Sequence, residues 1–261
     1  MSRDPDVADR EAGHDDWDRH WMGMAGSASR NPAQAMRRRL VSALLAAGSG
    51  ARILDVGCGH GDLVAELRRT HPHAELRGID YSRFGVEVAR TKVPGARFEQ
   101  CDLLRPAEPA PGMARWATHA VCSEVLEHVD EPDLLLANAR AYLAPGCRLV
   151  VTVPGGPMSA FDRHIGHRRH FTPAALRDML VAAGLHVDGV GGAGFPFFNL
   201  YRLVVILRGE RMVDDAGGTG AAEPSLAARA AMAVFRPLLA LPVPRNRLGW
   251  QVVGVATVPT A

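Results

Sequence analysis

The chain has 261 residues, of which 47% are hydrophobic, so it can bury a substantial core as one large domain or one domain with appendages. The formal net charge is only +2, which argues against a nucleic-acid partner. No apolar run reaches the roughly 20 residues that a spanning helix needs, and the polar N-terminus does not resemble a signal peptide. Four cysteines lie far apart without a CxxC pair, which excludes a disulfide framework and a zinc ribbon. We therefore expect a cytoplasmic protein without an integral membrane span.

The first fifty residues predict a tail followed by a helical segment. Residues 1–16 are charged and lack apolar periodicity, so they predict a mobile tail. From Trp17 to Ala47 the pattern is helical, with Pro32 suited to a first turn and apolar residues along one stripe. The glycines at 48 and 50 end this segment.

Strands and helices then alternate along the chain. This order is typical of a Rossmann-like, doubly wound α/β fold with a mostly parallel, seven-stranded sheet and helices on both faces. The strands are expected at 52–56, 75–79, 96–99, 120–123, 148–153, 185–190 and 251–258, and the helices at 62–69, 82–89, 132–143 and 173–183.

One stretch departs from this alternation. About sixty residues, 191–249, separate the sixth and seventh strands, too many for a hairpin connection. We expect a helical insertion before the last strand, so the predicted division is 1–50 tail and helical lid, 51–193 core, 194–248 insertion and 249–261 final core strand. Its apolar side chains would line a pocket for an aromatic or lipophilic molecule, form a homodimer contact or lie against a membrane. They are Phe195, Phe197, Phe198, Tyr201 and Leu203.

A glycine-rich turn follows the first strand and opens a helix. Gly57, Gly59 and Gly61 allow a sharp turn and close approach of the backbone to a ligand. The GxGxG spacing differs from the dinucleotide fingerprint GxGxxG, and Asp55 stands two residues before the first glycine. An acid at the edge of the loop suits a cationic ligand group better than a pyrophosphate. An α-amino acid with a nearby sulfonium is such a ligand.

Two further acids lie where an adenosine would need them. Asp80 ends the second strand, about twenty residues past the glycine turn, where a carboxylate can accept from both ribose hydroxyls. Asp102 follows the third strand, where it could accept from the exocyclic amine of adenine. The ordered set of acids and glycines therefore predicts an adenosine-containing ligand.

These residues belong to five segments that resemble, in order, the motifs of class I S-adenosylmethionine-dependent methyltransferases. The segments are 54–61, 78–82, 101–103, 123–129 and 143–149, and the resemblance covers residues 52–190. It implies that the three glycines face the methionine part of the cofactor, that Asp80 binds the ribose and that Asp102 and Leu103 lie at the adenine. Further cofactor-binding candidates within these motifs are Cys58, Tyr81 and Ser123. A Rossmann-like protein that binds another nucleotide, and does not transfer a methyl group, is the alternative.

The fourth motif contains an ExxEH string. On a helical turn Glu124, Glu127 and His128 would share one face and, with His167, could hold a divalent cation such as Mg²⁺. This is similar to two metal-dependent branches of the family, the quinone-pathway O-methyltransferases and the 2′-O-methyltransferases that act on small RNAs. His164 is the second match for the later histidine. ExxEH also occurs in class I enzymes that have no metal, where it caps and orients a helix.

The histidine-rich segment 162–171 also predicts a site without metal. His167 and His170 are candidates for a general base, because imidazole can accept a proton at neutral pH. Basic side chains nearby could hold an anionic substrate group, namely Arg163, Arg168 and Arg169. The competing interpretation is a solvated basic loop.

We therefore expect a methyltransferase acting on a small, aromatic or lipophilic molecule. Trp17 and Trp21 could close over the cofactor as a lid, or simply pack. The Ala/Arg/Gly-rich composition suggests secondary-metabolite, for example antibiotic, biosynthesis. Three other hypotheses remain. One is a metal-assisted O-methyltransferase of a quinone precursor or an RNA 3′ end, and another is an enzyme that methylates RNA or a protein. The third is a non-methylating nucleotide-binding protein.

Overall fold

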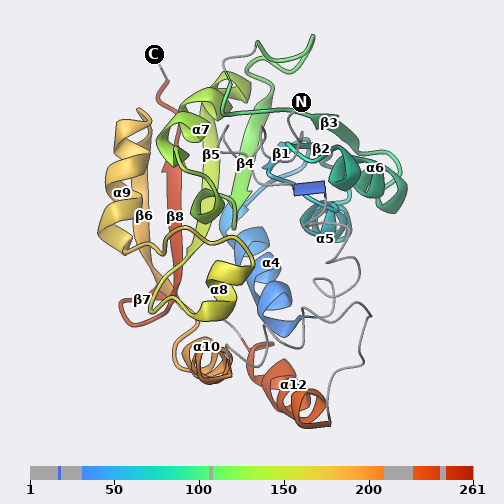
Figure 1. Cartoon of the computed structure of the whole chain (residues 1–261). Coiled ribbons are helices and arrows are strands. Elements are labelled where there is room, and N and C mark those ends of the chain that lie inside the picture. The colour runs from blue at the N-terminus through green and yellow to red at the C-terminus, as the bar shows by residue number, and fades with distance from the viewer. Residues whose placement is uncertain (1–16, 19–30, 106–107, 209–225, 242–244, 261) are drawn as a thin grey trace, which may run out of the picture.

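The structure, a computed structural model, describes residues 17–18, 31–105, 108–208, 226–241 and 245–260. The predicted tail and Trp21 lie outside these residues. Figure 1 shows one twisted sheet in the middle of the molecule with helices on both faces. This confirms the predicted Rossmann-like α/β architecture.

The sheet has the strand order β3-β2-β1-β4-β5-β8-β6-β7. Neighbouring strands from β3 to β5 run parallel, whereas β8 is antiparallel to both β5 and β6. All seven expected strands form, and the short β7 is an additional edge strand. Their bounds are β1 Arg52–Val56, β2 Glu75–Asp80, β3 Arg97–Gln100, β4 Ala117–Ser123, β5 Leu143–Pro154, β6 His186–Ala193, β7 Arg245–Asn246 and β8 Gln251–Thr257.

Local sequence signals begin most of the helices. Asn31 accepts from the Ala33 amide at the start of α4, and Pro32 occupies its first turn. Ser82 and Thr172 cap α6 and α9 in the same way. The helices are α4 Pro32–Leu45, α5 Asp62–Thr70, α6 Arg83–Lys92, α7 Pro132–Ala139, α8 Ala160–His164, α9 Pro173–Ala182, α10 Phe197–Leu207 and α12 Leu226–Leu238. None of the described helices combines the length and apolarity needed to cross a membrane.

The helix expected at 132–143 is shorter than predicted. It ends at Ala139, the turn η1 (Leu126–His128) precedes it, and a 3-10 turn, η2 (Arg140–Tyr142), leads directly into β5. β5 begins at Leu143 because this residue pairs with Ala117 at the start of β4. Sheet pairing therefore overrides the local helical pattern at this boundary.

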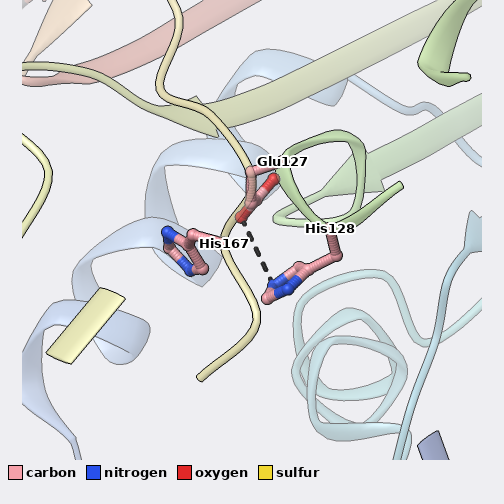
Figure 2. A group of neighbouring side chains, drawn as sticks. All are labelled: Glu127, His128 and His167. Atoms are coloured by element: carbon pink, nitrogen blue, oxygen red, sulfur yellow. Dashed lines mark ion pairs between the residues drawn. The ribbon is translucent and has the colours of Figure 1, made fainter. Parts of the chain in front are cut away.

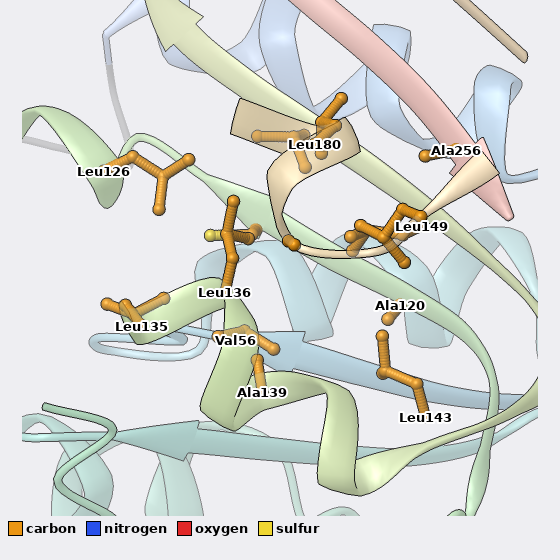
Figure 3. Close-up of a cluster of buried hydrophobic side chains, with 14 of the residues drawn as sticks. Val56, Ala120, Leu126, Leu135, Leu136, Ala139, Leu143, Leu149, Leu180 and Ala256 are labelled. Carbon is orange, nitrogen blue, oxygen red and sulfur yellow. The ribbon is translucent and has the colours of Figure 1, made fainter. Parts of the chain in front are cut away.

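Two apolar layers hold the helices against the sheet. One layer packs α7 and α9 on β1, β4 and β5, and Leu136 and Leu180 are almost completely buried in it (Figure 3). The other packs α4, α5 and α6 on the opposite face, through residues such as Val41 and Leu67. Val150 and Val151 point into different layers, as alternation along a strand requires. Each such leucine contributes about 2–5 kcal/mol, judged by the cost of its truncation.

The predicted insertion packs on the N-terminal helix. Phe198 of α10 and Leu239, just after α12, are buried against Ala33 and Met36 of α4. Figure 1 shows α10 and α12 together beyond the end of the sheet, next to α4 and α8. Residues of α10 lie near the carboxyl ends of β1 and β4, between which the strand order reverses, and ligands bind in the crevice at such a point.

Candidate active site

A cavity of about 370 Å³ lies at the carboxyl ends of the central strands. Its walls come from the glycine turn, the ends of β2 and β4, α4, the histidine-rich segment and α10. Eight of the ten predicted cofactor-binding residues line it: Asp55, Gly57, Cys58, Asp80, Tyr81, Asp102, Leu103 and Ser123. Gly59 and Gly61 are not among its lining residues.

The three glycines have different surroundings. Gly57 lines the cavity at φ 76°, and an added β-carbon would lie 2.3 Å from Cγ2 of Val125. The Gly59 amide donates to Oδ2 of Asp80 at 2.7 Å, which ties the turn to β2. Gly61 lets α5 approach α6, because a β-carbon there would lie 2.9 Å from Cβ of Ala89. Gly57 therefore shapes the cavity wall directly, whereas Gly59 and Gly61 act through contacts outside the cavity lining.

Two buried carboxylates face the cavity beside this turn. Burial, and then the charge of Asp80, raises the pKa of Asp55 to about 7. Burial also raises the pKa of Asp80 to about 6, although its oxygens accept from the amides of Gly59 and Ser82. A cationic ligand would favour the ionised forms of both groups. This end of the cavity therefore suits a ligand with a positive charge.

Asp102 lies further along the same wall. Its Oδ1 accepts from the Leu104 amide at 2.9 Å, and its Oδ2 is 3.2 Å from Nε of Arg105. The side-chain amide of Asn138 donates to the Leu103 carbonyl at 2.7 Å. These contacts hold a turn whose two leucines line the cavity, so they provide an apolar slot beside a carboxylate acceptor.

Residues 17–18 cover part of the cavity. The Trp17 ring meets the His128 ring edge-on, with centroids 4.9 Å apart, and it lines the cavity. Asp18 accepts from the Ser82 hydroxyl at 2.5 Å and from the Phe84 amide at 3.0 Å. Trp17 therefore lines the cavity, and its role as a lid stays a prediction.

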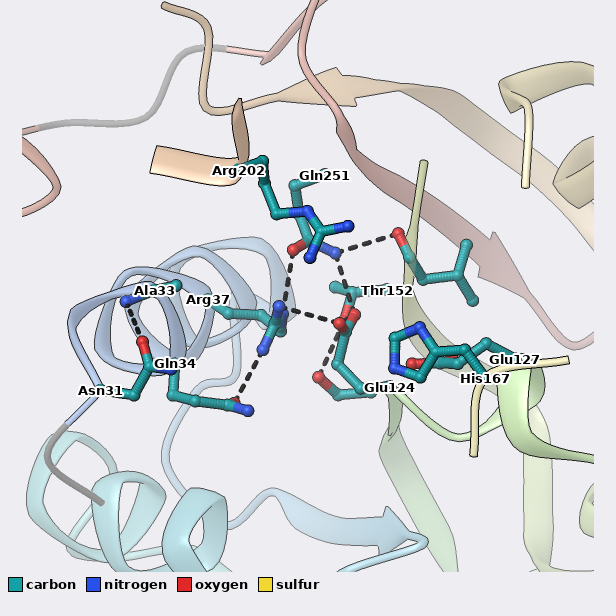
Figure 4. A network of polar contacts seen from close by, with 12 residues as sticks. Asn31, Ala33, Gln34, Arg37, Glu124, Glu127, Thr152, His167, Arg202 and Gln251 are labelled. Atoms are coloured by element: carbon teal, nitrogen blue, oxygen red, sulfur yellow. Dashed lines mark hydrogen bonds and ion pairs between the residues drawn. The ribbon is translucent and has the colours of Figure 1, made fainter. Parts of the chain in front are cut away.

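The ExxEH string does not form the predicted helical face. Glu124 adopts a left-handed backbone with φ 58°, and only the last three residues form η1. Figure 4 shows its side chain directed towards α4 and β8. Its Oε2 is 2.8 Å from Nη2 of Arg37, and Gln251 and Thr152 donate to its Oε1. The structure therefore does not bring Glu124 together with the other predicted metal ligands, because its charge is already paired.

Glu127, His128 and His167 do lie together (Figure 2). One ligand atom from each lies within 4.8 Å of the others. Glu127 is completely buried, and neither carboxylate oxygen has a hydrogen-bond partner among the described residues. Nε2 of His128 lies 3.8 Å from Oε1 of Glu127. Burial, and then the charge of Glu124, raises its pKa well above the usual value. A buried carboxylate in such a place is either neutral or bound to a cation, so these three residues fit a divalent ion.

A second group, Asp162, His167 and His170, lies beside the first. Arg202 of α10 already neutralises Asp162 through two hydrogen bonds, at 2.9 and 2.8 Å. Although burial acts in the other direction, this contact holds the pKa of Asp162 below its usual value. An added cation would be repelled by Arg202, so the Glu127 group is the better candidate.

His167 lines the cavity, whereas His170 lies behind it and is not among the lining residues. Nδ1 of His167 is 3.3 Å from Nε2 of His170, whose Nδ1 is 3.0 Å from the Gly156 carbonyl oxygen. Burial, followed by the neighbouring His128, lowers the pKa of His167 to about 3. Burial also lowers the pKa of His170. Both rings are therefore neutral at physiological pH.

The predicted substrate contacts are only partly brought together. Arg168 lines the cavity and pairs with Asp130, to whose carbonyl Arg169 donates, while Arg163 is exposed. Of the five apolar insertion residues, Phe198 and Tyr201 line the cavity. Phe195 and Leu203 are 42% and 43% exposed, and Phe197 packs against the cluster of α4 and α10.

Several residues of the cavity carried no recognisable signal in the sequence. They are Arg37, Arg38, Phe161, Arg202 and Trp250. They come from segments far apart in the chain, and no spacing rule relates them. Arg202, for instance, meets Asp162 from forty positions away, across the gap between α10 and α8.

Comparison with known proteins decides the family. Residues 28–189, more than half of the chain, match the family described as a methyltransferase domain. The chain belongs to the class I S-adenosylmethionine-dependent methyltransferases. This methyltransferase is 31% identical over 177 residues to a ubiquinone biosynthesis O-methyltransferase of Xylella fastidiosa, covering 59% of the chain and 69% of the relative. It is 32% identical over 142 residues to a trans-aconitate 2-methyltransferase of Methylobacterium nodulans, covering 53% and 50%.

Solved structures support the same fold for the methyltransferase. The cyclase SpnF superposes with a TM-score of 0.59 at 21% identity, over 87% of this chain and 82% of that one. Geranyl diphosphate C-methyltransferase from Streptomyces coelicolor superposes with a TM-score of 0.55 at 15% identity, over 86% and 76%. At these identities the likeness concerns the fold alone.

Proposed function

We propose that this methyltransferase transfers a methyl group from S-adenosylmethionine to a hydroxyl group of a small, aromatic or lipophilic molecule. The observation that carries this proposal is the continuity of one cavity. It runs from the acidic glycine turn to the imidazoles of His128 and His167 and to the aromatic side chains of Phe198 and Tyr201. Resemblance to relatives named as ubiquinone biosynthesis O-methyltransferases supports an oxygen acceptor, which we infer to be a hydroxyl group.

At the donor end, S-adenosylmethionine supplies a methyl group that its positively charged sulfur has already activated. We infer that the Asp55 carboxylate attracts the cationic part of this molecule and that Asp80 accepts from its ribose hydroxyls. Arg38 of α4 is our candidate for its α-carboxylate. It lines the cavity next to α5, where the charges of Asp62 and Glu66 act on its guanidinium.

At the acceptor end, the protein aligns the hydroxyl with the methyl group, excludes water and removes a proton. Of the two predicted general bases, His167 lines the cavity and His170 does not. With its pKa near 3 it is a weak base by itself, since an effective general base has a pKa near the working pH. A neutral imidazole is, however, the form that binds metal ions.

The second candidate function is therefore metal-assisted O-methylation. It is favoured by one observation: the buried Glu127 carboxylate has no hydrogen-bond partner in the part of the chain that the structure describes, and it lies next to His128 and His167. A divalent cation held there would lower the pKa of an acceptor hydroxyl. The quinone-precursor and RNA 3′-end hypotheses belong to this candidate function. The low net charge argues against RNA as the substrate.

We also propose a cellular setting for the enzyme. All four cysteines are free, which supports a cytoplasmic location. A role in antibiotic biosynthesis and a homodimer remain predictions of this proposal, as does the division into lid, core, insertion and final strand.

The test is a screen of catechols, phenols and prenylated phenols, with formation of S-adenosylhomocysteine as the readout. The protein is first dialysed against EDTA and assayed with and without magnesium. A metal-assisted enzyme loses activity and regains it, and Glu127→Gln raises the magnesium concentration needed for half activity. A metal-free enzyme keeps its activity after EDTA dialysis, and its rate falls roughly 10²–10⁴-fold in His167→Ala. An enzyme that keeps full activity after EDTA dialysis and also in the His167→Ala variant would refute a role for Glu127, His128 and His167.

A further inference from the structure

His167 is connected to the protein backbone through a second histidine. Its Nδ1 is 3.3 Å from Nε2 of His170, and Nδ1 of His170 is 3.0 Å from the Gly156 carbonyl oxygen. The His170 side chain is only 7% exposed. The His170 ring therefore lies between His167 and a fixed backbone acceptor, outside the cavity that His167 lines.

The chemistry of the three groups determines the direction of both hydrogen bonds. A carbonyl oxygen can only accept, so Nδ1 of His170 carries the proton. In a neutral imidazole the other nitrogen is then bare, so Nε2 of His170 accepts from Nδ1–H of His167. Oδ2 of Asp162 is 3.8 Å from the same nitrogen, but it already accepts from Arg202 and the Ser159 hydroxyl. Nε2 of His167 is in turn left without a proton. It is the nitrogen of this ring that remains for the Glu127 and His128 group and for the cavity.

The end of this chain of hydrogen bonds is held by the sheet. Gly156 has φ 69°, and an added β-carbon would lie 2.7 Å from the indole ring of Trp250. The Gly155 amide donates to the Trp250 carbonyl at 2.8 Å, which joins the segment after β5 to the start of β8. The carbonyl that orients His170 is thus fixed by contacts that do not depend on any ligand.

The backbone on either side of the imidazole of His167 is also fixed. The His167 amide donates to the Asp162 carbonyl at 2.9 Å, and the Arg168 amide donates to the Glu127 carbonyl at 2.8 Å. The segment is therefore attached to η1, so that His167 stays beside Glu127. Only the tautomer and the rotation of the ring are left for a side-chain contact to decide.

We propose that His170 is a positioning residue which holds His167 in the Nδ1–H tautomer, with the bare Nε2 directed towards Glu127 and the acceptor hydroxyl. His170 does not touch the substrate. This inference rests on the proposed function, because it assigns the lone pair that would accept a proton or bind a cation. It applies equally to the metal-free and the metal-assisted reaction, since both need that lone pair.

The test is nitrogen NMR on the full chain labelled with ¹⁵N-histidine, without metal. Two-bond proton–nitrogen correlations distinguish the two tautomers, and the signals of His167 are identified by their absence in His167→Ala. We expect Nδ1–H for His167 in the wild type. In His170→Phe the acceptor is lost, and His167 should shift to Nε2–H or to a mixture. His170→Gln places an oxygen near the position of Nε2, so it should restore the Nδ1–H form.

Calorimetric binding of S-adenosylhomocysteine, unchanged in all three variants, verifies that they are folded. Should His167 be Nε2–H in the wild type, or should His170→Phe leave its tautomer unchanged, the proposal is overturned. A second readout is turnover of a catechol probe, 3,4-dihydroxybenzoate, in which His170→Phe should lower kcat by roughly 10–100-fold with little change in KM, as expected for loss of an orienting partner. If the tautomers behave as expected but the probe is not methylated by the wild type, the positioning role stands and the proposed acceptor is wrong.

Discussion

Removing the charge of Asp55 should have two opposite effects: it should raise the stability of the ligand-free fold and lower the affinity for the cofactor. Asp55 is 3% exposed, and its pKa of about 7 lies far above its ordinary value because of burial and the nearby Asp80. Each unit of pKa difference between folded and unfolded chains corresponds to about 1.4 kcal/mol. Since the pKa rises from its ordinary value of 3.8 to about 7, ionisation of Asp55 costs the ligand-free fold about 4 kcal/mol.

The change to make is Asp55→Asn, which keeps the shape and removes the charge. Because the folded pKa is raised, the carboxyl group favours folding fully below pH 3.8, and this contribution is lost as the pH rises to about 7. We therefore expect the variant to match the wild type near pH 4 and to be more stable above pH 7. The gain should be about 1–4 kcal/mol, since the buried amide is itself not fully satisfied.

The assay is urea denaturation of the ligand-free proteins at pH 4, 5.5 and 8, with calorimetric binding of S-adenosylmethionine at pH 8. The same substitution should weaken cofactor affinity about tenfold or more, because a charge next to the cationic ligand is lost. Asp178→Asn, on the exposed face of α9, is the control and should change neither quantity. A variant that is less stable than the wild type at pH 8, or that binds the cofactor equally well, would contradict the role given to Asp55.

Three further predictions concern the walls of the cavity. Glu124→Gln should lower the free energy of unfolding by about 3–5 kcal/mol in thermal or urea denaturation, because it leaves the Arg37 guanidinium buried without its counter-ion; the double variant with Arg37→Met should recover much of that loss. Gly57→Ala should abolish binding of S-adenosylhomocysteine in calorimetry, since a β-carbon at φ 76° would displace the cavity wall, and intact binding would contradict this. Arg38→Met should weaken S-adenosylmethionine binding about tenfold without lowering Tm, whereas Arg177→Met on α9 should leave both unchanged.

Much of the fold followed from short-range patterns in the sequence. The glycine spacing, the acid two residues before it and the acid at the end of the second strand were recognisable because a turn between a strand and a helix needs them at fixed offsets. The seven core strands were predicted for a similar reason, since buried parallel strands are short apolar runs between turn residues. The structure confirms these strands and the α/β architecture, and the comparisons confirm the methyltransferase family.

Tertiary structure decided which charged groups meet. The sequence alone placed Glu124 with Glu127 on one helical face. In the fold, however, Arg37 and Gln251, which are 214 positions apart, meet at Glu124 and pair with its carboxylate. His170 likewise became a neighbour of the Gly156 carbonyl only through the path of the chain after β5. Periodicity and turn chemistry act within a few residues, so the sequence determined the elements and the donor end. Contacts between distant segments depend on how the helices pack on the sheet, and they arranged the acceptor end.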